Sequence, residues 1–193
     1  EYPITALTNY TESETVAFAE QDRFEVLRSS HMETQLHSFP YFGLYIWKNE
    51  NLLLSVRCGA IGQNGRGGHD HNDQLSIVIF QNDKFDLIDP GTGVYSPAPE
   101  IRNIYRSAQS HFLPVRLNSN GQVIEPAPLD QGLFSLCHQQ QGKILHLSKN
   151  KLIGWQKKTD LYLQLEITTE KIILTTNGNF NRDYLKKISP SKH

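Results

Sequence analysis

The sequence predicts an all-β fold, an antiparallel β-sandwich, and three observations carry this prediction. Short runs rich in Val, Ile, Leu and aromatic residues recur along most of the 193 residues. Several runs alternate apolar with polar residues, so that Leu161, Leu163 and Leu165 face one way and their neighbours the other. Turn-forming segments such as "NSNG" and "TTNG" separate the runs at hairpin spacing, and no long helical segments alternate with them. This pattern favours antiparallel sheets over a parallel α/β sheet.

The expected strands fill the middle of the chain, between two segments of a different kind. Residues 11–19, "TESETVAFA", combine capping hydroxyls and early acidic residues with a short apolar end, which fits either one or two helical turns or a linker. The last residues, "RDYLKKISPSKH", are expected to form a frayed or tethered tail. The expected strands are residues 41–47, 52–58, 74–80, 85–89, 113–118, 133–138, 143–149, 152–158, 161–167 and 171–176.

Turn signals separate these runs in order along the chain. The runs from "YFGLYIW" to "FDLID" are separated by "NEN" and "QND" and closed by Pro90 and Gly91, and those from "LPVRLN" to "KIILTT" are separated by "NSNG" and "QQQG". No linker-like stretch rich in Gly, Ser or Pro divides the chain, so one domain is expected. We expect a linker, short helix and first strand at 1–38, the sandwich domain at 39–180 and the tail at 181–193.

Composition excludes several classes of function. The chain has 19 Lys and Arg against 20 Asp and Glu, so it lacks the electrostatic footprint of a nucleic-acid-binding or anionic-membrane-binding protein. No apolar run is long enough to cross a bilayer, and the first residues lack the pattern of a signal peptide. Because the chain does not begin with Met, we expect it to be a piece of a longer protein. Cys58 and Cys137 lie in apolar runs, which favours buried free thiols over a disulfide.

Polar residues gather at the ends of the expected strands. The segment "GGHDHNDQLSIVIF" places His69 and His71 between two glycines and a buried run, and side chains two apart on a strand project to the same face. Asp89 closes a neighbouring run in "DLIDPGTG", and His111 stands before "LPVRL". Two imidazoles and a carboxylate suit a tetrahedral zinc site completed by a water or a fourth group. A single such residue is more often a surface or turn residue, so the site depends on these positions converging.

Two longer stretches add a resemblance to a known family. "CGAIGQNGRGGHDHNDQLSI" followed by "DLIDPGTGVYSPAPEIRNIYRSAQSH" resembles the C-terminal β-sandwich of heparinase II/III-like polysaccharide lyases, whose pattern runs GGHxHxDxLS, DPGT, RN and RSxxxH. The match covers about residues 39–136, and its motifs are specific together although each is weak alone. After the third histidine, where the family usually has Asn and Thr, this chain has Phe112 and Leu113.

The resemblance assigns a catalytic residue and a structural metal. His69 matches the family's active-site histidine on the sandwich. His71, Asp89 and His111 match the ligands of a zinc ion that holds the loops of the site in place and does not attack substrate.

The resemblance also suggests substrate contacts. Arg102, Asn103 and Arg106 fall in the matching "RNIYRS" stretch, where a guanidinium suits a substrate carboxylate or sulfate. Tyr105 in the same stretch has packing as an equally good interpretation, and Tyr95 is either a sugar-stacking ring or a core residue.

The activity that the resemblance implies is β-elimination on an acidic, uronic-acid-containing polysaccharide. A base removes the C5 proton of the uronate, and the bond from C4 to the glycosidic oxygen breaks, so the site needs a base, a neutraliser for the carboxylate and an acid. In such enzymes a helical toroid precedes the sandwich and supplies a tyrosine and an Asn or Arg. This chain is expected to be the second part of such an enzyme, inactive alone, and periplasmic or secreted.

Two alternatives remain open. The first is a non-catalytic carbohydrate-binding or scaffold module that keeps the zinc, which a toroid lacking a tyrosine opposite His69 would favour. The second makes His69, His71, Asp89 and His111 the catalytic metal site of a cupin-like barrel, which a redox-active iron or manganese with open positions would favour.

Overall fold

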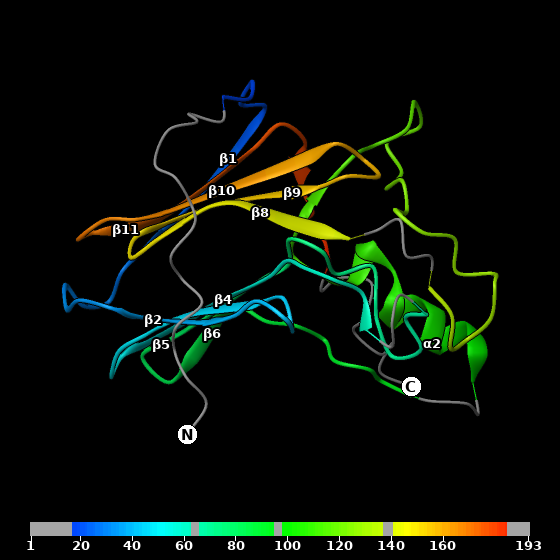
Figure 1. Ribbon diagram of the computed structural model, residues 1–193, viewed down its shortest axis with the longest axis horizontal. Coiled ribbons are helices and arrows are strands. Elements are labelled where there is room, and N and C mark those ends of the chain that lie inside the picture. The colour runs from blue at the N-terminus through cyan, green and yellow to red at the C-terminus, as the bar shows by residue number, and fades with distance from the viewer. Residues whose placement is uncertain (1–16, 63–65, 95–97, 137–140, 185–193) are drawn as a thin grey trace.

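Two antiparallel sheets of five strands form the body of the protein, and they face each other as two layers (Figure 1). The computed structural model describes residues 17–62, 66–94, 98–136 and 141–184. The order is β1–β11–β10–β9–β8 in the first sheet and β2–β3–β4–β5–β6 in the second. The predicted antiparallel β-sandwich is therefore confirmed.

The elements have the following bounds. The first sheet contains β1 (Asp22–Leu27), β8 (Gly142–Ser148), β9 (Lys151–Gln156), β10 (Leu161–Ile167) and β11 (Lys171–Thr176), and the second contains β2 (Gln35–Phe39), β3 (Leu44–Lys48), β4 (Leu52–Arg57), β5 (Ile77–Gln81) and β6 (Lys84–Leu87). Outside them lie helix α2 (Pro99–Arg106), the single turn η1 (Ala108–Ser110) and the paired short strands β7 (Pro114–Val115) and β12 (Asn179–Phe180). Among the described residues, no helix combines the length and apolarity that a bilayer crossing needs.

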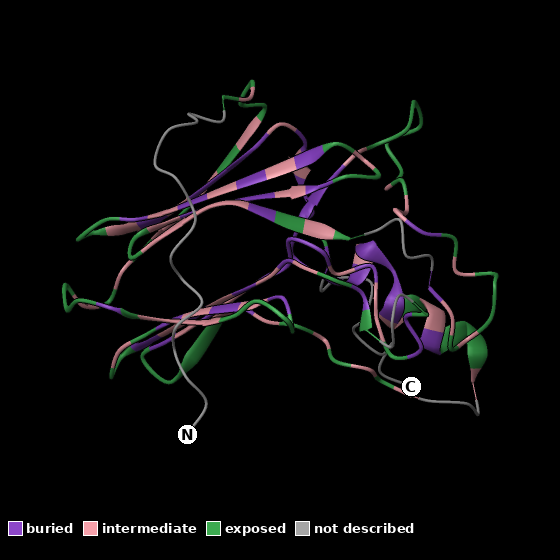
Figure 2. Ribbon diagram, in the orientation of Figure 1, coloured by how far each residue is buried: buried purple, intermediate pink, exposed green. Residues whose placement is uncertain are grey.

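Alternating burial along the strands builds the core between the two sheets (Figure 2). Strands β4 and β10 alternate between buried and half-buried positions, and Leu52, Leu54, Leu161, Leu163 and Leu165 are on the buried side. Trp47 of β3 is fully buried, and its indole N–H donates to the carbonyl of Lys149 (2.9 Å) in the turn between β8 and β9. This bond ties one sheet to the other. Cys58 is a buried free thiol, as predicted, and Cys137 lies outside the described residues.

The structure differs from the predicted elements in several places. The strands predicted for 41–47 and 74–80 begin only at Leu44 and Ile77, and of the strand predicted for 113–118 only Pro114–Val115 forms one. Residues 133–136 form a turn, and the strand predicted for 133–138 is wrong in this part. Residues 99–106, for which no helix was predicted, form α2, which begins with a proline and buries two arginines four residues apart. The N-terminal part holds both β1 and β2, and β1 completes the first sheet by pairing with β11. Most of the segment 11–19 lies outside the described residues.

Candidate functional site

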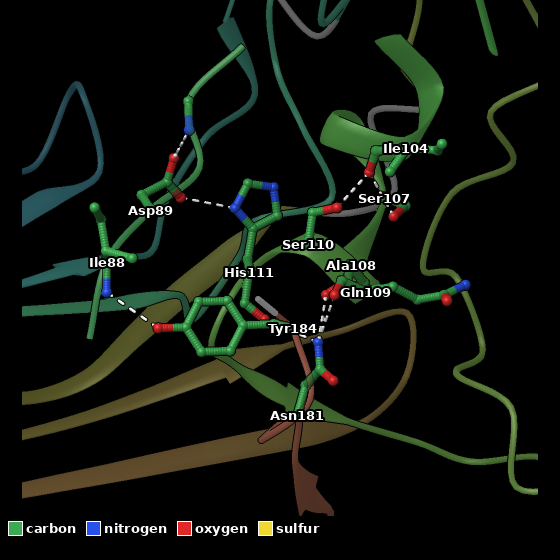
Figure 3. Close-up of polar contacts among 11 residues, drawn as sticks. Ile88, Asp89, Ile104, Ser107, Ala108, Gln109, Ser110, His111, Asn181 and Tyr184 are labelled. Atoms are coloured by element: carbon green, nitrogen blue, oxygen red, sulfur yellow. Dashed lines mark hydrogen bonds and ion pairs between the residues drawn. The ribbon is translucent and has the colours of Figure 1, made fainter. Parts of the chain in front are cut away.

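His111 directly follows η1, the turn that comes after α2, and its backbone is fixed by hydrogen bonds. The Asn181 side-chain amide donates to the carbonyls of Gln109 (2.9 Å) and His111 (3.1 Å), and it also reaches Ala108 (Figure 3). A single side chain therefore fixes the main chain within η1 and at His111, directly after it. The His111 side chain is 1% exposed.

Asp89 and His111 form the centre of the site. His111 Nδ1 lies 2.7 Å from Asp89 Oδ2 (Figure 3). Asp89 is held from both sides, because its Oδ1 accepts the N–H of Gly91 (2.8 Å) and the N–H of the preceding Ile88 donates to the Tyr184 hydroxyl (3.1 Å). Asp89 and His111 are far apart in the sequence, and the fold brings their side chains into direct contact.

The pair shifts the pKa of both its members. Burial acts to lower the pKa of His111, but the hydrogen bond and charge of Asp89 outweigh it and raise this pKa. Burial acts to raise the pKa of the Asp89 carboxyl, but the hydrogen bond and charge of His111 outweigh it and lower this pKa.

His71 lies beside this pair. Its ring centroid is 5.5 Å from that of His111, and burial, followed by the charge of His111, lowers the pKa of His71 to about 4. The loop is anchored by the neighbouring Asn72, whose N–H donates to the Arg106 carbonyl (2.8 Å) and whose side chain donates to Glu125 (2.5 Å). His71 is therefore a neutral imidazole at neutral pH, which is the form that binds metal.

The donor set fits a metal in its chemistry, although within the described ranges no three His, Cys, Asp or Glu side chains form a ready coordination shell. His111 Nε2 is buried and makes no hydrogen bond to any described residue. A buried ring nitrogen without a partner is costly, so a ligand for it is expected. Zinc accepts imidazole and carboxylate donors of this kind. His71, Asp89 and His111 remain the predicted ligands, with Asp89 on the Nδ1 side of the His111 ring and the unbonded Nε2 on the other side.

His69 differs from the other two histidines by its exposure. Its side chain is exposed, and its ring meets the edge of Phe134 with centroids 6.1 Å apart. The prediction that His69 and His71 share one strand face is wrong, since β5 begins only at Ile77 and Leu75 takes a positive φ of 69° in the loop before it. The loop instead presents His69 to solvent and turns His71 toward His111.

The two arginines of α2 point into the protein and not toward solvent. Arg102 and Arg106 are both 0% exposed. Arg102 Nε donates to Leu133 O (3.0 Å), and Arg106 donates to the carbonyls of Gly132 (3.1 Å) and Ser135 (2.6 Å). These bonds explain why residues 133–136 form a turn and not a strand, because their carbonyls bind guanidinium groups in place of a neighbouring strand.

The other two predicted substrate residues are placed differently. Asn103 accepts a hydrogen bond from Arg106 (3.2 Å) and lines a cleft of about 430 Å³, which Glu100 and Glu125 also border. Tyr95 lies outside the described residues. The structure therefore brings His71, Asp89 and His111 together and leaves Asn103 on the outer side of α2.

Comparison with known proteins identifies the family. The model of the family "Heparinase II/III-like, C-terminal" matches residues 31–166. The chain belongs to this family. No curated protein matches it.

Two solved structures of heparinases resemble the heparinase II/III-like sandwich described here. One is the crystal structure of heparinase III, with a TM-score of 0.50, 14% identity and 69% of this chain covered. The other is a mutant of the heparan sulfate lyase HepC from Pedobacter heparinus, with a TM-score of 0.45, 15% identity and 76% of this chain covered. The match spans 20% of the first structure's chain and 21% of the second's, so this chain corresponds to about a fifth of each.

Sequence reasoning missed several residues that build the site in this heparinase II/III-like domain. Asn181 and Tyr184 lie in the predicted tail, yet they fix the backbone at His111 and Asp89. No local signal identifies them, because an Asn and a Tyr near the end of a chain are ordinary residues. Phe112, where the family pattern has Asn, packs into the core and stacks on Phe180 with centroids 5.4 Å apart. That departure lies on the core side and leaves the His111 ring in place.

Proposed function

We propose that this domain is the sandwich part of a polysaccharide lyase that cleaves a uronic-acid-containing polysaccharide by β-elimination. The observation that carries the proposal is the exposed His69 imidazole, two residues before the rigid His71, which lies against the Asp89–His111 pair. Membership of the heparinase II/III-like family supports the substrate class. The same reasoning proposes a periplasmic or secreted location, where such polymers are found.

The chemistry sets what His69 has to do. The base takes the C5 proton, the C5–H electrons form the C4–C5 double bond, and the glycosidic oxygen leaves C4 with a proton. An exposed imidazole on an anchored loop can reach a bound substrate and take or give a proton there. In this proposal His69 is one member of the acid and base machinery, and a preceding helical toroid domain of the same protein supplies the rest.

Zinc belongs to the proposal as a structural ion. His71, Asp89 and His111 would hold it, because Asp89 lies 2.7 Å from His111 Nδ1 and the His71 and His111 ring centroids are 5.5 Å apart. When bound, the ion would cross-link the His69 loop to the ends of β6 and η1. It would keep His69 in place without touching substrate.

The first experiment tests the activity in the full-length protein. Purified protein is incubated with heparan sulfate, hyaluronan and alginate, and the ultraviolet absorbance of unsaturated uronate is followed. His69→Ala should reduce turnover by about 10²- to 10⁴-fold, the range for loss of a general acid or base. His37→Ala on β2 is the matched control and should retain activity. A lyase whose rate survives His69→Ala would contradict the role of His69, and no turnover on any uronate polymer would favour a binding module. The 193-residue chain alone is expected to be inactive.

The second experiment tests the metal. Elemental analysis of the purified chain should find about one zinc per molecule, because imidazole and carboxylate groups of three neighbouring residues are donors that zinc accepts. His71→Ala should lose it and His37→Ala should keep it. Zinc that persists in His71→Ala and His111→Ala alike would place the ion elsewhere.

A further inference from the structure

The turn at residues 132–135 is fixed by hydrogen bonds from two buried arginines. Two arginines that are fully buried use three hydrogen bonds to hold the carbonyls of Gly132, Leu133 and Ser135. Burying a guanidinium is costly unless it is well bonded. Leu136 N–H adds a bond to the Arg66 carbonyl (3.0 Å), close to the glycines that precede His69. The turn is therefore a rigid part of the same structure that carries the His69 loop.

This rigid turn presents one aromatic ring, that of Phe134. The side chain is 45% exposed although it lies in an anchored segment. The guanidinium carbon of Arg102 lies 4.6 Å from the ring centroid, over one face. Part of the ring therefore stays accessible to solvent although Arg102 covers one face.

The ring of Phe134 lies beside that of His69. The two rings meet at an interplanar angle of 69°, with centroids 6.1 Å apart. An aromatic ring and an imidazole thus stand side by side, with the guanidinium of Arg102 over one face of the aromatic ring. A pyranose ring has an apolar face of C–H groups, which packs on aromatic rings, and a uronate adds a negative charge that a nearby guanidinium attracts.

We propose that Phe134 is a sugar-stacking residue that seats one pyranose ring of an acidic polysaccharide against the His69 imidazole. In this view Arg102 and Arg106 are positioning residues that hold the turn, and they contact the sugar only through Phe134. The inference deepens the proposed function and rests on it for the uronate, while the stacking itself requires only a pyranose.

The test separates binding from turnover. Binding of heparan sulfate, hyaluronan and alginate oligosaccharides to the full-length protein is measured by calorimetry in a His69→Ala background, where no cleavage interferes. Phe134→Ala should weaken binding by about tenfold. Phe134→Tyr should restore it, and Phe134→Leu should not, since it keeps apolar bulk without a ring. Phe85→Ala is the matched control, because Phe85 is 53% exposed and contacts Phe80 in the β5–β6 hairpin.

A second measurement uses kinetics with His69 intact. Phe134→Ala should raise KM by about tenfold and change kcat less, whereas a general loss of structure would lower kcat and the melting temperature together. If Phe134→Ala does not fold, the KM of Phe134→Leu is measured in its place.

Each outcome bears on one proposal or on both. Unchanged binding and KM in Phe134→Ala and Phe134→Leu would overturn the stacking role even if the protein is a lyase. Oligosaccharide binding that depends on Phe134, without any turnover in the wild type, would support stacking and refute the lyase. Neither binding nor cleavage of any oligosaccharide would overturn both.

Discussion

His69 and His111 are two different kinds of histidine, and burial separates them. His111 is 1% exposed, is paired with Asp89 and has a buried ring nitrogen that bonds to no residue in the described part of the chain, whereas His69 is exposed. The first suits a fixed ligand and the second suits contact with a substrate. From the sequence both are histidines near a strand end, so only the fold distinguishes them.

Cys58 gives a prediction at the same scale. Burial raises the pKa of its thiol to about 12, so the thiolate that reacts with alkylating reagents is almost absent at neutral pH. In a Cys137→Ser variant, which leaves Cys58 as the one thiol in the sequence, native protein should resist iodoacetamide at pH 8 and urea-unfolded protein should react fully. Mass spectrometry of the two samples measures the difference. Rapid labelling of the native sample would show that Cys58 is accessible.

Tyr184 gives a prediction about the site. Its hydroxyl accepts the Ile88 N–H next to Asp89, and its ring packs on the edge of Phe112 with centroids 5.7 Å apart. Tyr184→Phe keeps the ring and leaves the N–H without its partner, which should lower the free energy of unfolding by about 1 kcal/mol. Urea unfolding measures this, and Tyr162→Phe on β10 serves as control. Equal stability of Tyr184→Phe and wild type would contradict a role for this bond.

At the scale of elements, the segment after β12 acts as part of the sandwich. Arg182 donates two hydrogen bonds to Asp22 of β1 (2.6 and 2.8 Å), and the Phe180 N–H donates to the same carboxylate (2.8 Å). Asn181 and Tyr184 reach the site from the same segment. Four neighbouring residues thus link the edge of the first sheet to the candidate metal ligands.

The Asp22–Arg182 link predicts a pH dependence. Burial acts to raise the pKa of Asp22, but the bonds from Arg182 and Phe180 outweigh it and hold this pKa below its ordinary value of 3.8. A depressed carboxyl pKa stabilises the folded state above the unfolded pKa, and this stability is lost as the pH falls through the folded pKa. Asp22→Asn should therefore lower the free energy of unfolding by about 1 kcal/mol at pH 7, with Arg182 half exposed and partly screened.

Urea unfolding at two pH values checks this prediction. The difference between Asp22→Asn and wild type should shrink when the pH is brought below the folded pKa of Asp22. A difference of the same size at both pH values would mean that the carboxylate charge is not its origin. Glu25→Gln, which removes an exposed ion pair with Lys171 on the same sheet, is the control and should change stability less.

The elements show where sequence reasoning succeeds and where it fails. Strand β10 was predicted at its observed bounds, because Leu161, Leu163 and Leu165 alternate with half-buried residues and the pattern is local. Helix α2 was missed, because its two buried arginines give it a polar composition that the apolar period of a core helix does not match. The burial of Arg102 and Arg106 depends on carbonyls about thirty residues later in the chain, which no local pattern reveals.

At the scale of the whole molecule, the proposed zinc gives a testable gain in stability. An ion that binds only the folded state stabilises it by mass action, and one that joins β6 to η1 and the His69 loop should stabilise all three. A chelator should lower the melting temperature of the purified wild type by about 5 °C. It should leave His71→Ala unchanged. A wild type that melts at the same temperature with and without chelator would count against a structural metal.

The β-sandwich could be predicted from the sequence. For the site, the sequence predicts the residue types but not the contacts between them. Alternation and turns suffice for two antiparallel sheets, since each hairpin is decided within about twenty residues. The contact between Asp89 and His111 requires β6, η1 and Tyr184 to be in place, and the neighbour of β1 could not be read from its own sequence. These features come from packing between distant segments.

The pairing of β1 with β11 also constrains the order in which the molecule is made. Asp22 lies opposite Thr176, and Leu27 lies opposite Lys171, so among the described strands the neighbour of β1 follows it by more than 140 residues. During synthesis, all strands of the second sheet, β2 to β6, have emerged from the ribosome before β11 is made. Until then β1 lacks the strand with which it pairs. The first sheet, the bonds from Asn181 and Tyr184 and the finished site can therefore form only after synthesis has passed residue 184, and partly translated chains depend on other means to keep β1 from aggregating.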